Sequence, residues 1–282
     1  MRLAPSFGDV SERELVGYLL RASGQDGDGA VNPSPILDLL RLRHISLDFP
    51  NELPEAVHPG REQPRALLSF PERVIATDSN LREQRARFST FHEIGHYVLP
   101  EHVEAIVLCT ERDLSPGARS VRAREANSFA AELMFHGTCF TLDANTKEAC
   151  AATIKELAQK YRASFESTAR RLVEKSIRPR MLVVFESIAD DRRIDISEPP
   201  QWRVKYSIAS RSFSLDFFTR VAGDLDGRDV AAILTPGRDI AESISKEETI
   251  PLPDGTEATF HAEYFTNHRA VFCLLRPVRS AL

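Results

Sequence analysis

Two histidines and one glutamate within five residues carry the clearest chemical signal in this sequence. Residues 92–96 are HEIGH, which is the pattern HExxH. Residues four apart lie on one face of an α-helix, so His92 and His96 can both bind one zinc ion at about 2.0–2.1 Å. Glu93 is one position further round the helix, where its carboxylate can take a proton from an activated water and pass it to a leaving amine. The segment predicts a metal-dependent hydrolase in which Glu93 is the catalytic residue.

The elements that must position these side chains follow from hydrophobic periodicity and from proline. A helix is expected from about Asn80 to Val98, ended by Pro100, and a second long helix over about residues 119–135. Strand-like runs precede the first helix at residues 66–70 and 73–76. Zinc peptidases usually hold an extended substrate on an edge strand, and we expect that strand in this upstream pair. The apolar residues around the histidines argue against the alternative that His92, Glu93 and His96 form an ordinary polar helix face with no catalytic role.

Two segments resemble the ImmA/IrrE family of zinc metallopeptidases. Residues 88–100 are FSTFHEIGHYVLP and residues 124–134 are REANSFAAELM. The family pattern is F-T-x-x-H-E-x-G-H, followed further along the chain by E-x-E-A-N-x-F-A-A-x-L-L-M-P. The resemblance implies a zincin-like fold, bound Zn²⁺ and a site-specific endopeptidase. Such enzymes cleave a helix-turn-helix transcriptional repressor in a stress or mobile-element response.

The resemblance also assigns residues, and here the sequence departs from the family. His92 and His96 match the zinc histidines, and Glu93 matches the catalytic glutamate. The third family ligand is a Glu four residues before the Asn of the second motif, and this position is Ala123. The nearby Glu125 is the candidate third ligand, but on a regular helix it lies about 200° round from Ala123 and is expected to face solvent.

Three hypotheses about the third ligand remain open. A substitution has removed it from a working enzyme, or the natural protein has lost it, or another donor takes its place. The replacement donors considered are Glu125, Glu101, His102 and His136. Two histidines and waters hold zinc less tightly than three protein ligands do, so the sequence predicts a recognisable but weakened metal site.

Three neighbouring residues are interpreted as structural. Tyr97 follows the second histidine and is expected to pack in the core. His102 and Cys109 flank the segment after the helix, and a lone His and a lone Cys are more often structural than a metal- or redox-sensing pair.

The predicted fold class is α+β. A mostly helical, zincin-like metallopeptidase domain with a small sheet is expected over residues 1–143. A helix-turn-helix-like pair is expected over residues 144–179, and a β-rich, GAF-like sensory domain over residues 180–282. The helical pair carries a basic face, for which we favour a packed, solvated helical pair over DNA binding because the chain is acidic overall. Its members are Lys155, Lys160, Arg162, Arg170 and Arg171.

Composition limits the class of protein further. The chain has 282 residues, of which 42% are apolar and 27% charged, with a formal net charge of -5, which excludes a disordered chain and disfavours nucleic acid as the main partner. None of its four cysteines forms a CxxC pair, so a cysteine-rich zinc site and a disulfide framework are not expected. No apolar run approaches the roughly 20 residues that span a bilayer, and we expect a cytoplasmic protein without a membrane partner.

These observations support one main hypothesis and two alternatives. The main hypothesis is a zinc-dependent endopeptidase whose partner is a helix-turn-helix repressor, bound as substrate. The first alternative, suggested by Ala123, is a degenerate peptidase that binds and regulates a partner without cutting it. The second is a DNA-binding regulator that uses residues 154–172.

Overall fold

The chain folds as two compact α+β units, in agreement with the predicted class. The computed structural model describes residues 10–53, 62–187, 202–217, 242–252 and 255–278. The first unit contains residues 1–140 and 160–162, and the second contains residues 141–159 and 163–282. The domain boundaries expected from the sequence, after residues 143 and 179, stay predictions.

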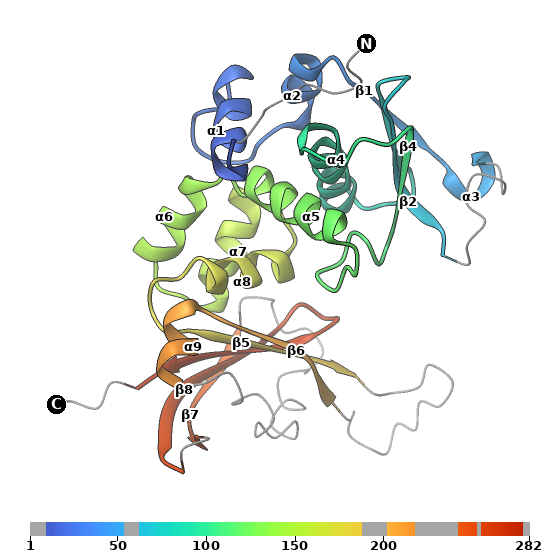
Figure 1. Cartoon of the computed structure of the whole chain (residues 1–282). Helices are drawn as coiled ribbons and strands as arrows, with labels where there is room; N and C mark the ends of the chain where they lie inside the picture. Colours follow the sequence, from blue (N-terminus) through green and yellow to red (C-terminus); the bar gives the residue numbers. More distant parts are fainter. Residues whose placement is uncertain (1–9, 54–61, 188–201, 218–241, 253–254, 279–282) are drawn as a thin grey trace. The chain divides into compact units, whose positions relative to one another are not determined.

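The first unit consists of helices around a small sheet (Figure 1). Its elements in chain order are α1 (Glu12–Ala22), α2 (Pro33–Leu40), β1 (Arg43–Leu47), α3 (Phe49–Glu52), β2 (Pro64–Ser69), β3 (Val74–Asp78), α4 (Glu83–Val98), β4 (Ile106–Thr110) and α5 (Val121–Met134). α6 (Thr138–Thr146) and α7 (Ala151–Lys160) follow, and each of them contributes residues to both units.

The sheet of the first unit has the order β1-β3-β2-β4. β1 pairs with β3 in parallel, whereas β2 pairs antiparallel with both β3 and β4. The strand directly upstream of α4 is therefore β3, which lies inside the sheet with a partner on each side. The expectation of an edge strand in the upstream pair was wrong, because β2 and β3 are both interior. The edge strands of the described sheet are β1 and β4, of which β4 follows α4 in the chain.

α4 lies between the sheet and α5, and a glycine allows the close approach of the two helices. α4 contacts β2 and β3 on one side and α5 on the other, as Figure 1 shows. A Cβ atom on Gly95 would lie 3.2 Å from Cδ1 of Phe129 and 3.3 Å from Cα of Ala126. Every residue of α4 from Ser89 to Val98 is buried, so the HExxH segment lies inside the unit.

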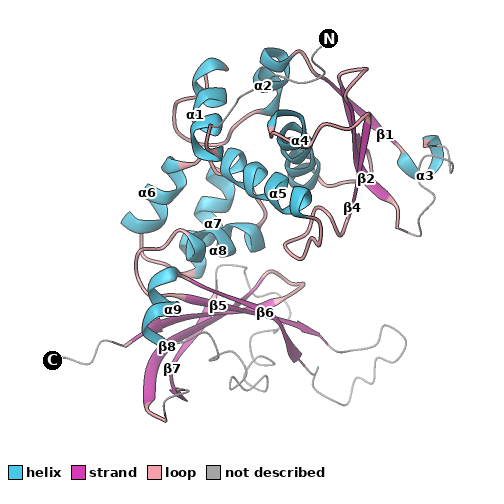
Figure 2. Ribbon diagram, in the orientation of Figure 1, coloured by secondary structure: helices cyan, strands magenta, loops and turns pink. Residues whose placement is uncertain are grey.

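The second unit is a five-stranded antiparallel sheet with helices on both faces (Figure 2). Its further elements are α8 (Phe165–Glu174), β5 (Met181–Ser187), β6 (Trp202–Ala209), α9 (Arg211–Phe217), β7 (Ser243–Pro251), β8 (Glu257–Thr266) and β9 (Val271–Pro277). The strand order is β6-β5-β9-β8-β7.

Aromatic side chains attach helices to the two faces of this sheet. Phe165 of α8 packs on Phe265 and Phe272 on one face. On the other face, Phe213 of α9 packs against Phe260. Because both faces are covered, β5 is buried from Met181 to Phe185 and has the continuous apolar sequence that its burial requires.

Candidate metal centre

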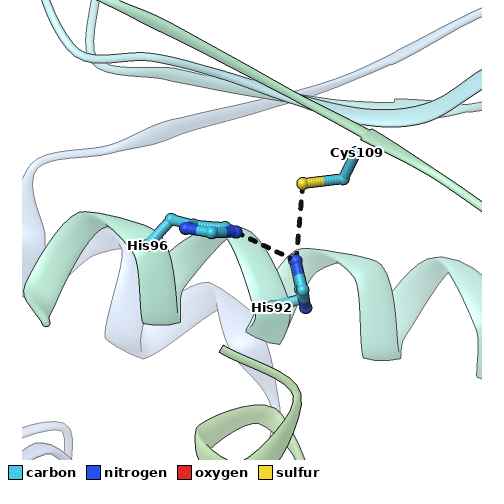
Figure 3. Close-up of side chains that lie close together, drawn as sticks. All are labelled: His92, His96 and Cys109. Atoms are coloured by element: carbon cyan, nitrogen blue, oxygen red, sulfur yellow. Dashed lines mark hydrogen bonds between the residues drawn. The ribbon is translucent and has the colours of Figure 1, made fainter. Parts of the chain in front are cut away.

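Three donor atoms from two elements converge in the interior of the first unit. Nε2 of His92 lies 3.1 Å from Nε2 of His96 and 3.4 Å from Sγ of Cys109. All three side chains are buried, and their donor atoms lie within 4.8 Å of one another. Figure 3 shows the two imidazoles on one helix and the thiol on the strand that faces it. These contacts place a metal-type donor cluster at the predicted HExxH segment.

β4 brings Cys109 to this cluster. The strand is a short apolar run with β-branched residues at Ile106 and Val107, and it pairs with β2 so that Cys109 lies opposite Ala66. After the strand, the carboxylate of Asp113 accepts hydrogen bonds from the backbone N–H and the hydroxyl of Thr110, which fixes the turn. The pairing with β2 and this turn set the position of the thiol.

Asn127 orients the first histidine. Its Nδ2 donates to the backbone carbonyls of Asp113 at 2.7 Å and Ser115 at 3.0 Å, so Oδ1 is the atom that faces His92. Nδ1 of His92 lies 2.9 Å from that oxygen and must carry its proton in order to donate to it. In the neutral ring the Nε2 atom is then a bare acceptor, directed at the donor cluster.

A second chain of contacts leads from the other histidine to the surface of α5. Nδ1 of His96 lies 3.0 Å from Nδ1 of His102, and Nε2 of His102 lies 2.9 Å from Oε2 of Glu125. Glu125, the candidate third ligand from the sequence, is thus outside the donor cluster and contacts His102 instead. His102 is buried next to a ligand-type histidine, so its interpretation as merely structural is incomplete.

The distances fit a four-coordinate divalent cation. With zinc bonds of about 2.0–2.1 Å to nitrogen and 2.3 Å to sulfur, tetrahedral ligands lie about 3.4 Å apart for an N–N pair and 3.6 Å for an N–S pair. The observed separations of 3.1 Å and 3.4 Å are close to these values. Imidazole and thiolate ligands also occur together at catalytic zinc.

Burial keeps both histidines neutral, which is the form that binds metals. Desolvation lowers the pKa of His92 to about 3, although the hydrogen bond that its ring donates to Asn127 opposes this. Desolvation also lowers the pKa of His96 to about 2, with smaller contributions from His92 and His102. At neutral pH both rings therefore present lone pairs to the site.

The catalytic candidate Glu93 is fully buried beside the cluster. Neither of its carboxyl oxygens has a hydrogen-bond partner among the described residues. Desolvation raises the pKa of Glu93 to about 8; the nearby Cys109 thiol opposes this rise and the charge of Asp113 adds to it. A buried carboxyl without a partner is costly, and its place next to three metal-type donors gives it a chemical explanation.

The thiol is not an activated nucleophile in this environment. Desolvation, together with the negative charge of Glu93, raises the pKa of Cys109 well above its usual value. Catalytic cysteines instead have a lowered pKa. A cation at the cluster would displace the thiol proton, as metal binding does for cysteine ligands in general. The chemistry of Cys109 is therefore that of a ligand.

Ala123 lies at the same site without a donor atom. It lines a cavity of about 210 Å³ together with His96, His102 and Cys109. The helix position that holds glutamate in the family thus faces the centre here, as the motif implies. The small side chain leaves the donor role to another residue.

The other donors considered from the sequence lie outside the cluster. Glu101 is exposed in the turn after α4. Nε2 of His136 lies 2.7 Å from the backbone carbonyl of Gln25. Tyr97 stacks on Phe70 in the core, with ring centroids 5.5 Å apart, as expected.

Cys109 is the site residue that the sequence analysis missed. The run IVLCT at residues 106–110 has the composition of a short strand, but that composition does not show that the strand pairs beside α4. On a strand after the HExxH helix, a cysteine becomes a candidate donor rather than a lone structural residue.

Comparisons with known proteins give one family match and a likeness in fold. Residues 53–173 match the family described as the IrrE N-terminal-like domain, a peptidase family. A solved structure named as a Mycobacterium tuberculosis transcriptional regulator is similar in fold, with a TM-score of 0.51 and 15% sequence identity. The match covers 95% of this chain and 88% of that one. No curated protein matches the chain.

The matched segment contains both sequence motifs and all three donors of the cluster. It extends from Leu53 to Val173 and so includes α4, β4 and α5. Among the described residues, no helix has the length and apolar character needed to cross a membrane. Residues 53–173 of this chain therefore match the IrrE N-terminal-like domain, the domain of the family that the two sequence motifs resemble.

Proposed function

We propose that this chain is a zinc-dependent, site-specific endopeptidase that cleaves a helix-turn-helix transcriptional repressor. The observation that carries the proposal is the buried cluster of His92, His96 and Cys109 beside the unpartnered carboxyl of Glu93. The match of residues 53–173 to a peptidase family supports the reaction class. The likeness to a structure named a transcriptional regulator supports a role in gene regulation.

The residues of the site divide the chemistry among them. His92, His96 and Cys109 would hold the zinc, which when bound supplies Lewis-acid activation of water and of the scissile carbonyl. Glu93 accepts the proton of the attacking water at its carboxylate and delivers it to the amine nitrogen that leaves. Because Glu93 is fully buried, electrostatic interactions at its carboxylate are stronger than they would be in water.

Cys109 would supply the third protein ligand that Ala123 cannot provide. A thiolate from β4 completes a set of three protein ligands and leaves the fourth position open for catalysis. The site is then a working centre with a replaced ligand, rather than a two-histidine remnant. β4 pairs only with β2 among the described strands, so its other edge can align an extended substrate next to the centre.

The second unit is proposed to be a GAF-like sensory domain. Its five-stranded antiparallel sheet with helices on both faces supports this. We propose that this domain senses the signal that activates the peptidase, in a stress or mobile-element response in the cytoplasm. The second candidate function is a degenerate, partner-binding regulator, which Ala123 alone favours.

One experiment tests the proposed function. The chain would be purified without chelator, its zinc content measured, and hydrolysis of a proteome-derived peptide library followed by mass spectrometry. We expect near one zinc per chain, and cleavage at a defined set of sites. Glu93→Gln should keep the zinc and lose about 10²–10⁴-fold in rate, because it removes proton transfer alone. Cys109→Ala should lose zinc, and adding Ala123→Glu to it should restore binding.

Three outcomes would contradict the proposal. A wild-type chain without zinc would remove the metal centre. Undiminished cleavage by Glu93→Gln would remove the mechanism. Full zinc binding by Cys109→Ala would show that the thiolate is not a ligand. Cys150→Ala is the control and should keep its zinc, because Cys150 lies in the second unit.

A further inference from the structure

We infer that His102 is a positioning residue of the metal centre, held in place by Glu125. His102 would fix the tautomer and the ring orientation of His96, so that the Nε2 atom of His96 is free to bind the cation. This inference rests on the proposed metal centre, and it gives roles to two residues that are outside the donor cluster.

The first step is the contact between Glu125 and His102. An ionised carboxylate only accepts hydrogen bonds, so the ring nitrogen that faces it must carry the proton. Nε2 of His102 lies 2.9 Å from Oε2 of Glu125 and is therefore the N–H donor. In the neutral ring, Nδ1 of His102 is then a bare acceptor.

The second step is the contact between His102 and the proposed ligand His96. Nδ1 of His96 lies 3.0 Å from the bare Nδ1 of His102, and a hydrogen bond between them requires the proton to be on His96. Nε2 of His96 is then also bare. It faces Nε2 of His92, whose proton Asn127 holds on the opposite nitrogen.

The third step concerns the pair of bare nitrogens. Two lone pairs 3.1 Å apart repel each other unless a proton or a cation lies between them. His102 on one side and Asn127 on the other keep the Nδ1 protons away from this space. The arrangement is complementary to a cation, and second-sphere partners of this kind typically change metal affinity about 10–100-fold when removed.

The backbone is shaped to bring His102 to this place. α4 ends at Val98, and Pro100 and Glu101 then turn the chain. Glu101 has a φ of 64°, a left-handed conformation that is unfavourable for a residue with a Cβ. This turn carries His102 back to a buried position with 1% of its side chain exposed. Unfavourable backbone conformations of this kind persist where the surrounding structure requires them.

Glu125 gives the contact an outer anchor on a rigid element. It lies in the second turn of α5, two residues before Asn127. The same helix thus orients both histidine ligands, one directly through Asn127 and the other through Glu125 and His102. This accounts for an acidic side chain that is half exposed but directed at a buried histidine.

The test measures the affinity of the full chain for Co²⁺ and Zn²⁺ by competition with a chromophoric chelator. His102→Leu removes the Nδ1 acceptor and puts an apolar side chain of similar size in its place. We expect about 10–100-fold weaker metal binding. His102→Asn places an amide oxygen near the position of Nδ1, and we expect it to recover most of the affinity. Glu125→Ala should weaken binding in the same direction, but less.

Glu104→Ala is the matched control for the loss of charge. Glu104 lines the same cavity and forms its ion pair with Arg122, whereas His102 contacts Glu125. If the effect of Glu125 is only long-range attraction for a cation, Glu104→Ala will weaken binding as much as Glu125→Ala, and the inference fails. Metal-free unfolding curves of every variant show whether the fold is intact.

A second readout depends on the tautomer itself. ¹⁵N-edited NMR of the Zn²⁺-loaded protein should show His102 with its proton on Nε2. A proton on Nδ1 would overturn the inference, as would His102→Asn binding no better than His102→Leu. Wild-type affinity in His102→Leu, with His92→Ala unable to bind, would overturn the inference and leave the proposed function standing. No metal binding by the wild type would overturn both.

Discussion

At the scale of single residues, the centre places groups where they are unfavourable for the empty protein. Glu93 is a fully buried carboxyl without a hydrogen-bond partner among the described residues, and both histidines are held neutral. Such groups reduce stability unless a ligand compensates for them. The cost therefore supports a bound cation, and it can be measured on the metal-free protein.

Glu93→Gln should stabilise the metal-free protein, and more so at high pH. The pKa of Glu93 is about 8 in the fold against 4.5 for the free side chain, so the folded state retains a proton that the unfolded state releases. Stability from this group is complete below pH 4.5 and is lost as the pH rises through about 8. The variant has no such loss, and its advantage at pH 8 over pH 5 should be of the order of a few kcal/mol.

Urea unfolding in the presence of chelator, at pH 5 and pH 8, measures this difference. The two histidines have the opposite dependence, because their lowered pKa values give stability that is lost as the pH falls below 6.5. They are present in both proteins and cancel in the comparison. An equal effect of Glu93→Gln at the two pH values would show that Glu93 titrates normally.

At the scale of elements, the sequence predicted the parts of the site that depend on local periodicity. His92, Glu93 and His96 lie on one helix, so their geometry follows from the spacing alone. Helix geometry also placed Ala123 toward the site, and Ala123 does line the cavity; Glu125 is exposed, but its carboxylate contacts the buried His102, which helix geometry did not predict. The long helices α4 and α5 were predicted for the same reason, within a few residues of their ends.

The part that could not be predicted depends on strand pairing between distant segments. Cys109 reaches the histidines because β4 pairs with β2 in a register that tertiary packing sets. The strand has five residues and its burial does not alternate strictly, so it gives a weak periodic signal. The prediction of an edge strand upstream of α4 was wrong for the same reason, since the sequence of a single strand does not determine its place in the sheet.

Gly95→Ala tests the close packing of α4 on α5. In an exposed helix this change would stabilise by about 1 kcal/mol through propensity. Here the new Cβ would lie 3.3 Å from Cα and 3.4 Å from the carbonyl oxygen of Ala126, which are backbone atoms that cannot move independently. We expect a net loss of about 1–2 kcal/mol in the free energy of unfolding, together with weaker zinc binding as the histidines shift.

Gly17→Ala in α1 is the matched control. Its Cβ would meet only the end of the flexible Arg21 side chain, at 3.2 Å, and that side chain can move away. This variant should be about 0.5–1 kcal/mol more stable than the wild type. Equal stabilisation by both substitutions would mean that the helices separate at little cost and that Gly95 is not needed for packing.

At the scale of the whole molecule, the fold is larger than the family domain. The family match ends at residue 173, whereas the structural likeness covers 95% of the chain. The second unit has its own apolar core, formed by β5, β8 and β9 with α9. The chain as a whole is acidic, with a formal net charge of -5.

The basic face predicted on α7 and α8 is mostly engaged within the chain. Lys160 pairs with Asp28 at 2.9 Å, Arg170 pairs with Glu174 at 3.1 Å, and Arg162 pairs with Glu83. Arg171 is buried. α8 also packs its Phe165 on the sheet of the second unit. Few cations are then left to neutralise phosphates, which disfavours a DNA-binding role.

We therefore expect binding to duplex DNA to be weak and to depend little on salt. Each phosphate contact contributes a slope of about -0.9 in log affinity against log salt concentration, so fewer than about two contacts would give a slope shallower than -2. Fluorescence anisotropy of a labelled duplex between 50 and 300 mM salt measures it. Lys160→Ala and Arg162→Ala should leave the slope unchanged. A slope of about -4 or steeper, made shallower by these substitutions, would mean that Lys160 and Arg162 leave their ion pairs to contact DNA. The helical pair would then be a DNA-binding element, and the expectation of weak binding would be wrong.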